Sequence, residues 1–439
     1  MDENLASYEP SSFTVDLSNL ELSSDNDFIV PEDFGAFVHE WWHYFQDIST
    51  ITGQFGFYMM MRDLARVSQT TCSGTENIIS LPLDKDTFGD PISKDRKLYN
   101  VICGETINER ISDFSITSSP EIKNTELKYE GHSKDIAKCN LKINNKDYTL
   151  GIIALQEMNC FYVQKISEKY SPKPPRVSAD SLPEFPYKVG ELLFTYYSID
   201  ADLASKLLIT YLCLDSIQAP VVLLKMLEVL KEKKYEFKKD RDNIIKIFNE
   251  VSSTYSECND KIYCEWVKDY ASWIKDETKK NMSDSLKWYL TKLVDISSVK
   301  DRMGQGCFIT DFCHSLRGFQ MLYSFFPVPI FKKDGILYGS SMIGKKPILD
   351  FQNEYNNALF LWFLKRVYKL LSIKKSSDLQ NLAECELYSK CQYRDIVDKD
   401  YDCKTAVWQV IQDEKKAKCP YGLALHTMGL WQNRIEIKD

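Results

Sequence analysis

The sequence predicts an α+β protein, with a small antiparallel sheet and a helix in its N-terminal part and a mainly α-helical C-terminal region. Residues 10–30 alternate apolar and polar side chains, which is the period of a half-buried strand. Beyond residue 191, apolar residues recur at helical spacing almost to the end of the chain. With 439 residues, of which 44% are hydrophobic, the chain can bury one large core or two ordinary ones.

Composition and charge exclude several classes of function. The net charge of −8 has the wrong sign for wrapping a phosphate backbone, so we expect no direct nucleic-acid partner. No apolar stretch approaches the roughly 18 residues that a membrane span needs. The acidic opening MDENLASYEP does not read as a secretory signal, and thirteen cysteines, an odd number, do not suggest a disulfide framework. We therefore expect reduced thiols and a cytoplasmic location.

The first predicted helix follows the strands at 10–30. Pro31 stands where a helix begins, acidic residues occupy its first turn, and apolar residues recur at helical spacing as far as Ile48. We expect a break near Thr52 and Gly53, a second helix over 57–67, and mostly loop from 68 to 108.

Strands and another helix are predicted next. Residues 126–150 read as strands with a hairpin turn at 144–147, and residues 151–170 carry the spacing of a buried helix. Five prolines then crowd residues 172–186, which predicts a linker or a long ordered loop at 171–190.

The C-terminal region is expected to be helical, with one β interruption. A hairpin is predicted at 328–338. We expect a first domain over 1–170 and a helical region over 191–439 that recognises substrate or regulates activity. The predicted helices lie at 192–196, 204–215, 219–230, 244–251, 263–274, 286–294 and 358–371.

The chemistry of the chain is indicated by its histidines. There are only five, and two of them, His39 and His43, lie four residues apart within the predicted helix. Residues i and i+4 share a helix face, so both imidazoles can bind one cation. Glu40, beside them, is placed to take a proton from metal-bound water. The plainer alternative is a pair of histidines on an ordinary buried helix.

With the motif His39-Glu40-Trp41-Trp42-His43, which is HExxH, the sequence resembles the zincin metallopeptidases, and more narrowly the gluzincin type. The longer HExxHxxGxxH pattern is absent, because Gln46 stands at the glycine position and no third histidine follows. The resemblance covers about residues 10–170. It implies a zincin-like domain that binds one zinc ion per chain and hydrolyses peptide bonds.

A glutamate on a later helix completes the metal site in gluzincins, and Glu157 is the best candidate here. It is a polar residue on an otherwise apolar helix, directly after a strand-like run. His132 is the alternative third ligand, or a donor to the transition state. The plainer reading of Glu157 is an exposed helix glutamate.

Three further residues are candidates for supporting roles. Gln46 and Asp47 lie about one helical turn beyond His43, where they could hydrogen-bond a ligand and orient it. Tyr162 is a candidate hydroxyl donor to the oxyanion of the reaction.

Two competing readings involve other metals. A di-iron site would use the half-motif Glu40-x-x-His43 but needs a second Glu-x-x-His, which the chain lacks. An iron–sulfur cluster or a second zinc ion could instead be held by thiolates. The candidate ligands for that second site, spaced x5, x11 and x15, are Cys385, Cys391, Cys403 and Cys419.

The function expected from the sequence is that of a zinc metallopeptidase of narrow specificity, acting on a protein or peptide and controlled by a protein partner or a signal. A bacterial defence or effector role would fit such an enzyme by analogy. The alternative is a degenerate zincin fold that serves as a binding module.

Overall fold

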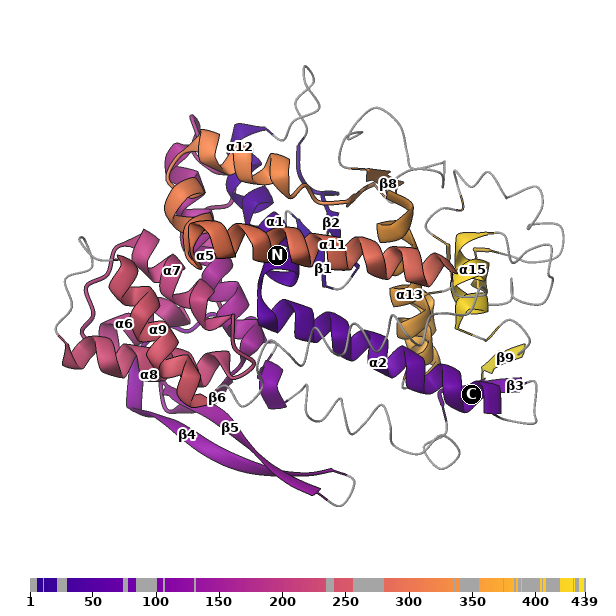
Figure 1. The fold of residues 1–439 in the computed structure, drawn as a ribbon, viewed down its shortest axis with the longest axis horizontal. Helices are drawn as coiled ribbons and strands as arrows, with labels where there is room; N and C mark the ends of the chain where they lie inside the picture. Colours follow the sequence, from indigo (N-terminus) through magenta and orange to yellow (C-terminus); the bar gives the residue numbers. More distant parts are fainter. Residues whose placement is uncertain are drawn as a thin grey trace.

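The computed structural model shows a mixed α+β protein with small sheets (Figure 1). It describes residues 6–10, 12–21, 30–73, 78–83, 101–105, 107–129, 132–233, 241–255, 280–334, 336–339, 355–373, 375–382, 384–385, 388, 403–404, 406–407, 419–428, 430 and 434–437.

The N-terminal elements are β1 (Ser7–Glu9), β2 (Thr14–Asp16), the 3-10 helix η1 (Pro31–Asp33), α1 (Phe34–Ser49) and α2 (Ile51–Ser73). The helix expected after Pro31 is thus confirmed. The break lies at Thr50 rather than at Thr52 and Gly53, and α2 then continues six residues past the predicted end at 67. Gly53 fits because α2 starts against the last turn of α1, where a Cβ on Gly53 would lie 2.3 Å from the Cα of Asp47.

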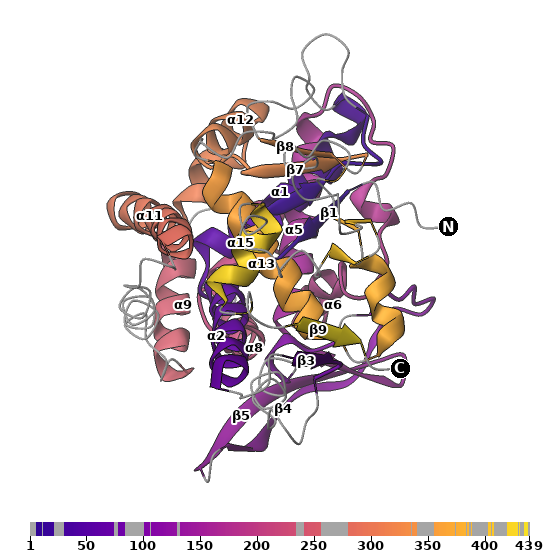
Figure 2. The same ribbon diagram turned by 90° about the vertical axis from the view of Figure 1, so that its right-hand side faces the viewer.

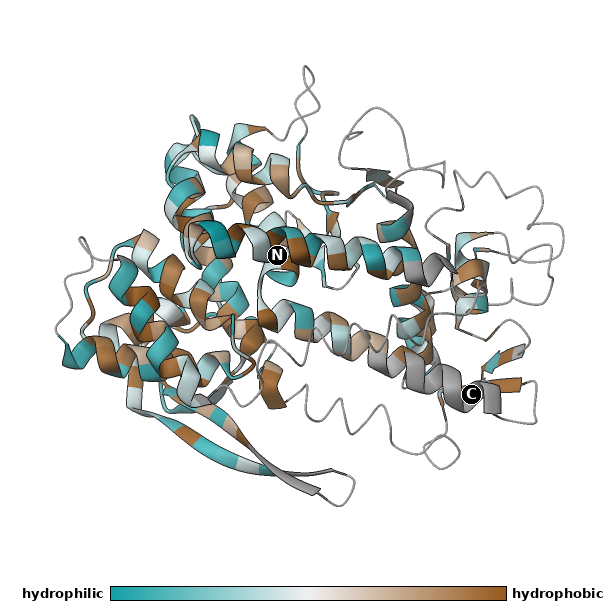
Figure 3. Ribbon diagram, viewed as in Figure 1, coloured by the Kyte–Doolittle hydropathy of each residue, from teal (hydrophilic) through white to brown (hydrophobic). Residues whose placement is uncertain are grey.

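The middle of the chain forms β3 (Ile78–Leu81), β4 (Ile116–Tyr129), β5 (His132–Ile143), β6 (Lys146–Leu150) and α5 (Ile152–Tyr170). Strands β4, β5 and β6 pair antiparallel in that order. Asn144 and Asn145 make the predicted turn with φ of 47° and 62°, a region that asparagine tolerates. The β4–β5 hairpin projects from the molecule (Figure 1), and its described part is mainly hydrophilic (Figure 3).

The remaining chain is mainly helical, as expected, and the hairpin predicted at 328–338 is confirmed as β7 and β8. The helix predicted at 263–274 lies outside the described residues. No described helix combines the length and the apolar character that crossing a membrane requires. The elements are η2 (Ala179–Ser181), α6 (Val189–Tyr196), α7 (Leu203–Cys213), α8 (Ala219–Glu232), α9 (Arg241–Tyr255), α11 (Lys280–Met303), η4 (Phe308–Phe312), α12 (Leu316–Phe325), β7 (Ile330–Lys333), β8 (Ile336–Gly339), α13 (Tyr355–Leu371), η6 (Ser376–Asn381), α15 (Pro420–Thr427) and β9 (Arg434–Ile437).

Distant parts of the chain share sheets and a core. One sheet has the order β1-β2-β7-β8, with β2 and β7 parallel, and another pairs β3 with β9 (Figure 2). One large cluster of buried apolar side chains extends from Ala6 to Ile435. The described contacts therefore cross the boundary expected at 171–190. Within that segment, which contains η2 and the first residues of α6, Arg176 binds the buried carboxylate of Asp33 at the start of α1.

Helix α1 lies at the centre of this arrangement, packed between α5, α2 and α11. Its tryptophans are fully buried, and Trp41 donates from Nε1 to the carbonyl of Phe326 at 3.1 Å. The ammonium of Lys300 on α11 donates to the last α1 carbonyl, that of Ser49, and also binds Asp215. A cation at a helix C-terminus is favourable, so α11 anchors the end of α1.

Candidate metal centre

The register between α1 and α5 is set by a buried asparagine. Asn159 on α5 accepts hydrogen bonds at Oδ1 from Trp42 Nε1 (2.6 Å) and Gln46 Nε2 (3.0 Å), both on α1. Its own amide nitrogen donates to Leu207 and Thr210 on α7. Buried polar groups are costly unless they are paired, so this network favours one alignment of the three helices.

That alignment brings Glu157 to the two histidines of the HExxH motif. Glu157 Oε2 lies 3.2 Å from Nε2 of His39 and 3.2 Å from Nε2 of His43. The side chains of His39, His43 and Glu157 are 6%, 13% and 21% exposed, so the group is largely buried yet open to solvent on the glutamate side. Three side chains of types that bind metal ions therefore lie together, although 118 residues separate His39 from Glu157 in the sequence.

The tautomer of His39 follows from its second contact. His39 Nδ1 lies 3.0 Å from Gln164 Oε1 on α5. The Gln164 amide nitrogen donates to Glu168 at 2.9 Å, which identifies the oxygen as the atom that faces the imidazole. Nδ1 of His39 therefore carries a proton and donates it to Gln164, and the free lone pair of a neutral ring is on Nε2.

This tautomer makes the geometry fit a cation. The bare Nε2 of a neutral His39 faces a carboxylate oxygen at 3.2 Å, and two lone pairs at that distance repel unless a proton or a metal ion lies between them. Nitrogen and oxygen ligands of a tetrahedral zinc ion, each 2.0–2.2 Å from the metal, are about 3.3 Å apart. The distances from Glu157 to His39 and His43 therefore match the edges of such a site.

The pKa shifts of Glu157 and His43 are those expected in a site that binds positive charge. Burial alone would raise the pKa of Glu157, but His43 and His39 outweigh burial and hold that pKa well below its usual range. Burial would likewise lower the pKa of His43, whereas Cys160 and Glu157 raise it well above normal. A bound metal ion would replace the protons that the imidazoles otherwise need here.

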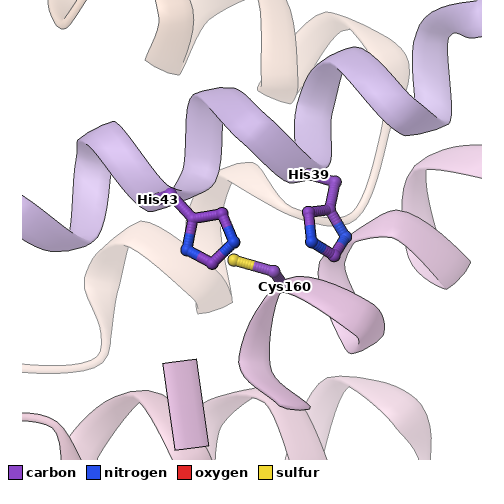
Figure 4. A group of neighbouring side chains, drawn as sticks. All are labelled: His39, His43 and Cys160. Atoms are coloured by element: carbon purple, nitrogen blue, oxygen red, sulfur yellow. The ribbon is translucent and has the colours of Figure 1, made fainter. Parts of the chain in front are cut away.

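A thiol joins the same group. Ligand atoms of His39, His43 and Cys160 all lie within 4.8 Å of one another, and Figure 4 shows the sulfur of Cys160 beside the two imidazole rings. Cys160 hydrogen-bonds His43, and burial raises the pKa of its thiol to about 12. It lies three residues after Glu157 on α5, which places both residues on one helix face.

Glu40 lies at the edge of this group. Burial raises the pKa of its carboxyl, opposed by His39 and His43, and the backbone N–H of Tyr8 on β1 donates to its carboxylate. The ring of Tyr8 stacks on His43, with ring centroids 6.2 Å apart and planes at 8°. Strand β1 therefore covers one side of the HExxH helix.

The supporting residues expected from the sequence have other partners. Asp47 accepts a hydrogen bond from the hydroxyl of Tyr8 at 2.6 Å, so it is joined to His43 through the stacked tyrosine ring. Gln46 belongs to the Asn159 network. The hydroxyl of Tyr162 lies beside Gly190 on α6 and not among the ligand atoms. His132 begins β5, and its side chain lies outside the described residues.

Of the C-terminal cysteines, Cys391 lies outside the described residues. The backbone N–H of Cys385 donates to the carbonyl of Cys403 at 2.9 Å, and Cys419 caps α15 by accepting from Gly422 at Sγ. The three described thiols do not form a group of ligand atoms as close as that around His39. The four-thiolate site stays a prediction.

Sequence reasoning missed four residues of the site, namely Cys160, Gln164, Tyr8 and Tyr187. Cys160 and Gln164 follow Glu157 by three and seven residues, so helical spacing was the signal that could have found them. The ring of Tyr187 lies 5.7 Å from that of His39. Its pKa is raised by burial and then by Glu157 and Glu40, while Asn108 donates to its oxygen.

No protein-family model, curated protein or solved structure matches this chain.

Proposed function

We propose that this protein is a zinc-dependent metallopeptidase whose metal is held by His39, His43 and Glu157. The observation that carries the proposal is the convergence of one glutamate oxygen on two imidazole nitrogens at 3.2 Å, with the partially buried Glu40 beside them. Two imidazoles and one carboxylate are the ligands of a catalytic zinc site that keeps one position for water.

The chain's own residues supply the rest of the chemistry. Zinc bound at this site would polarise a peptide carbonyl and lower the pKa of a water molecule. The carboxylate of Glu40 takes the proton of the attacking water and returns it to the leaving amine. Tyr187, whose oxygen is hydrogen-bonded to Asn108 and whose ring lies beside His39, would donate its hydroxyl proton to the developing oxyanion.

A peptide substrate is favoured by the position of β1. Among the described strands, β1 is an edge of its sheet, and the N–H of Tyr8 reaches the carboxylate of Glu40. An extended peptide can pair with a free strand edge through main-chain hydrogen bonds. Such pairing at β1 would place the peptide next to the general base and would require Glu40 to release the N–H of Tyr8.

The thirteen cysteines suggest a reducing compartment. We propose the cytoplasm as that compartment, and a protein partner or signal as the control on the activity.

The test combines metal analysis with hydrolysis of a peptide library. Wild-type protein purified without chelator should hold about one zinc ion per chain. Glu40→Gln should keep the metal and lose activity by about 10²- to 10⁴-fold, because only the proton transfer is removed. His43→Ala should lose both the metal and the activity. A wild-type protein that is free of metal, or a Glu40→Gln variant that is fully active, would overturn the proposal.

A further inference from the structure

Cys160, whose sulfur is grouped with ligand atoms of His39 and His43, has no role in the mechanism proposed above. Cys160 lies on the same face of α5 as Glu157, and its sulfur is within 4.8 Å of ligand atoms of both histidines. Adjacent nitrogen and sulfur ligands of a tetrahedral zinc ion are about 3.5 Å apart. Binding of one ion would require ligand atoms that lie up to 4.8 Å apart to approach to about that distance.

The surroundings of Cys160 favour a metal ligand over an ordinary buried thiol. Its side chain is fully buried, but the atoms at its sulfur include a nitrogen of His43, to which it hydrogen-bonds. By contrast Cys213, equally buried on α7, has its sulfur against the thioether of Met226 at 3.6 Å. The two thiols are equally buried, but Cys160 has an imidazole nitrogen at its sulfur where Cys213 has a thioether. Burial in the core therefore does not by itself account for the polar surroundings of Cys160.

We propose that Cys160 is the fourth protein ligand of the metal, and that the resting protein holds a closed site of two imidazoles, one carboxylate and one thiolate. Imidazole and thiolate are both good zinc ligands, and a coordinating thiol loses its proton on binding. Zinc sites with four protein ligands are structural, whereas catalytic sites keep one position open. Cys160 therefore occupies the position that water needs.

This inference rests on the metal site of the proposed function and adds a way in which the peptidase activity is controlled. While the sulfur of Cys160 is bound, Glu40 has no activated water from which to take a proton. Activity requires that the thiolate leave the metal, which a partner that shifts α5 against α1, or a reagent that modifies the thiol, would achieve. The folded protein therefore has low activity, which comes from the molecules whose Cys160 is detached from the metal, and this is the activity that Glu40→Gln would lose.

The first test needs no variant. X-ray absorption at the zinc edge of the wild-type protein should show one sulfur scatterer at about 2.3 Å together with nitrogen and oxygen scatterers at about 2.0–2.2 Å. The cobalt(II)-substituted protein should show a thiolate-to-cobalt charge-transfer band in the near ultraviolet. A metal-loaded protein that has neither sulfur scattering nor this band would overturn the inference.

The second test compares Cys160→Ala with Cys213→Ala, a matched buried cysteine outside the group. Cys160→Ala should lose the charge-transfer band but still bind cobalt, and its peptide hydrolysis should rise by about tenfold or more, because a coordination position opens. Cys213→Ala should keep the band and the low wild-type activity. Equal hydrolysis by Cys160→Ala and by the wild type would overturn the latency.

The two proposals fail in different ways. If the band is present and depends on Cys160 but no variant hydrolyses any peptide, the ligand assignment stands and the peptidase function fails. If the wild type hydrolyses peptides without a thiolate signal, the function stands and the role of Cys160 fails. Should Cys160→Ala unfold, Cys160→Ser and the zinc-edge measurement decide the ligand assignment.

Discussion

Gln164 accepts a hydrogen bond from Nδ1 of His39 at 3.0 Å, and this contact determines which nitrogen of His39 can bind a metal. A partner of this kind fixes both the tautomer and the orientation of a ligand, and its loss typically weakens metal binding about 10- to 100-fold. We expect Gln164→Ala to weaken zinc binding by that factor, as measured by competition with a chromophoric chelator.

Gln156→Ala is the matched control for this change. Gln156 is on the same helix, and its contact with Gln46 is made by its backbone carbonyl, which the substitution keeps. Equal zinc affinities of the two variants would show that Gln164 does not orient His39.

Tyr187→Phe should lower kcat and leave KM and zinc content nearly unchanged. The hydroxyl is proposed to act only on the charge that develops during the reaction, and one such donor is typically worth about 10²- to 10³-fold in kcat. Steady-state kinetics in the Cys160→Ala background measures the effect. Tyr196→Phe, which removes a hydroxyl bonded to Ser119, is the control. A loss confined to KM would assign Tyr187 to substrate binding.

Asn159→Leu should reduce the free energy of unfolding by about 3 kcal/mol, because it leaves the indole N–H of Trp42 and the amide of Gln46 without their common acceptor in a buried place. Urea unfolding followed by circular dichroism measures the change. Asn249→Ala on the exposed side of α9 should change stability by less than about 0.5 kcal/mol. Similar effects from both variants would contradict the role of the Asn159 network.

Glu168 gives a prediction for pH. Burial raises the pKa of its carboxyl above 4.5, the ordinary value, despite hydrogen bonds from Ala179 and Gln164 that lower it. Its contribution to stability is therefore full below pH 4.5 and is lost as the pH rises through the folded-state pKa. We expect Glu168→Gln to gain stability relative to the wild type over that interval, measured by urea unfolding between about pH 4 and pH 7.

The opposite pH dependence of stability is expected at Glu109, where the hydrogen bond from Lys146 lowers the carboxyl pKa. Its contribution is present above the ordinary value of 4.5 and is lost as the pH falls through the folded-state pKa, so Glu109→Gln should be less stable than the wild type above pH 4.5, and this difference should vanish in acid. The same pH trend in both variants would contradict the two assignments.

The parts of the fold and site that depend on local spacing could be predicted from the sequence. Helical periodicity located α1 and α5, and the i, i+4 rule placed His39 and His43 on one face. Glu157 stood out because a charged residue interrupts an apolar helix. Cys160 did not, since a cysteine on a buried helix face has the same pattern as an ordinary core residue.

Contacts between distant segments could not be predicted. The parallel pairing of β2 with β7 joins Val15 to Phe331, and short strands carry too little pattern to specify a partner so far along the chain. The start of α2 at Ile51 was also missed, because Gly53 reads as a break when its role is to let two helices approach closely.

The hydrogen bond from Lys300 to the last carbonyl of α1 has a consequence for fragments of the protein. A fragment that ends at residue 170 would carry His39, His43, Glu157 and Cys160, yet it would lack Lys300 and strand β7, which pairs with β2. Such a fragment would contain every proposed metal ligand but not the distant residues that hold α1 and β2 in place. The proposed metal centre therefore depends on contacts that residues beyond 170 supply.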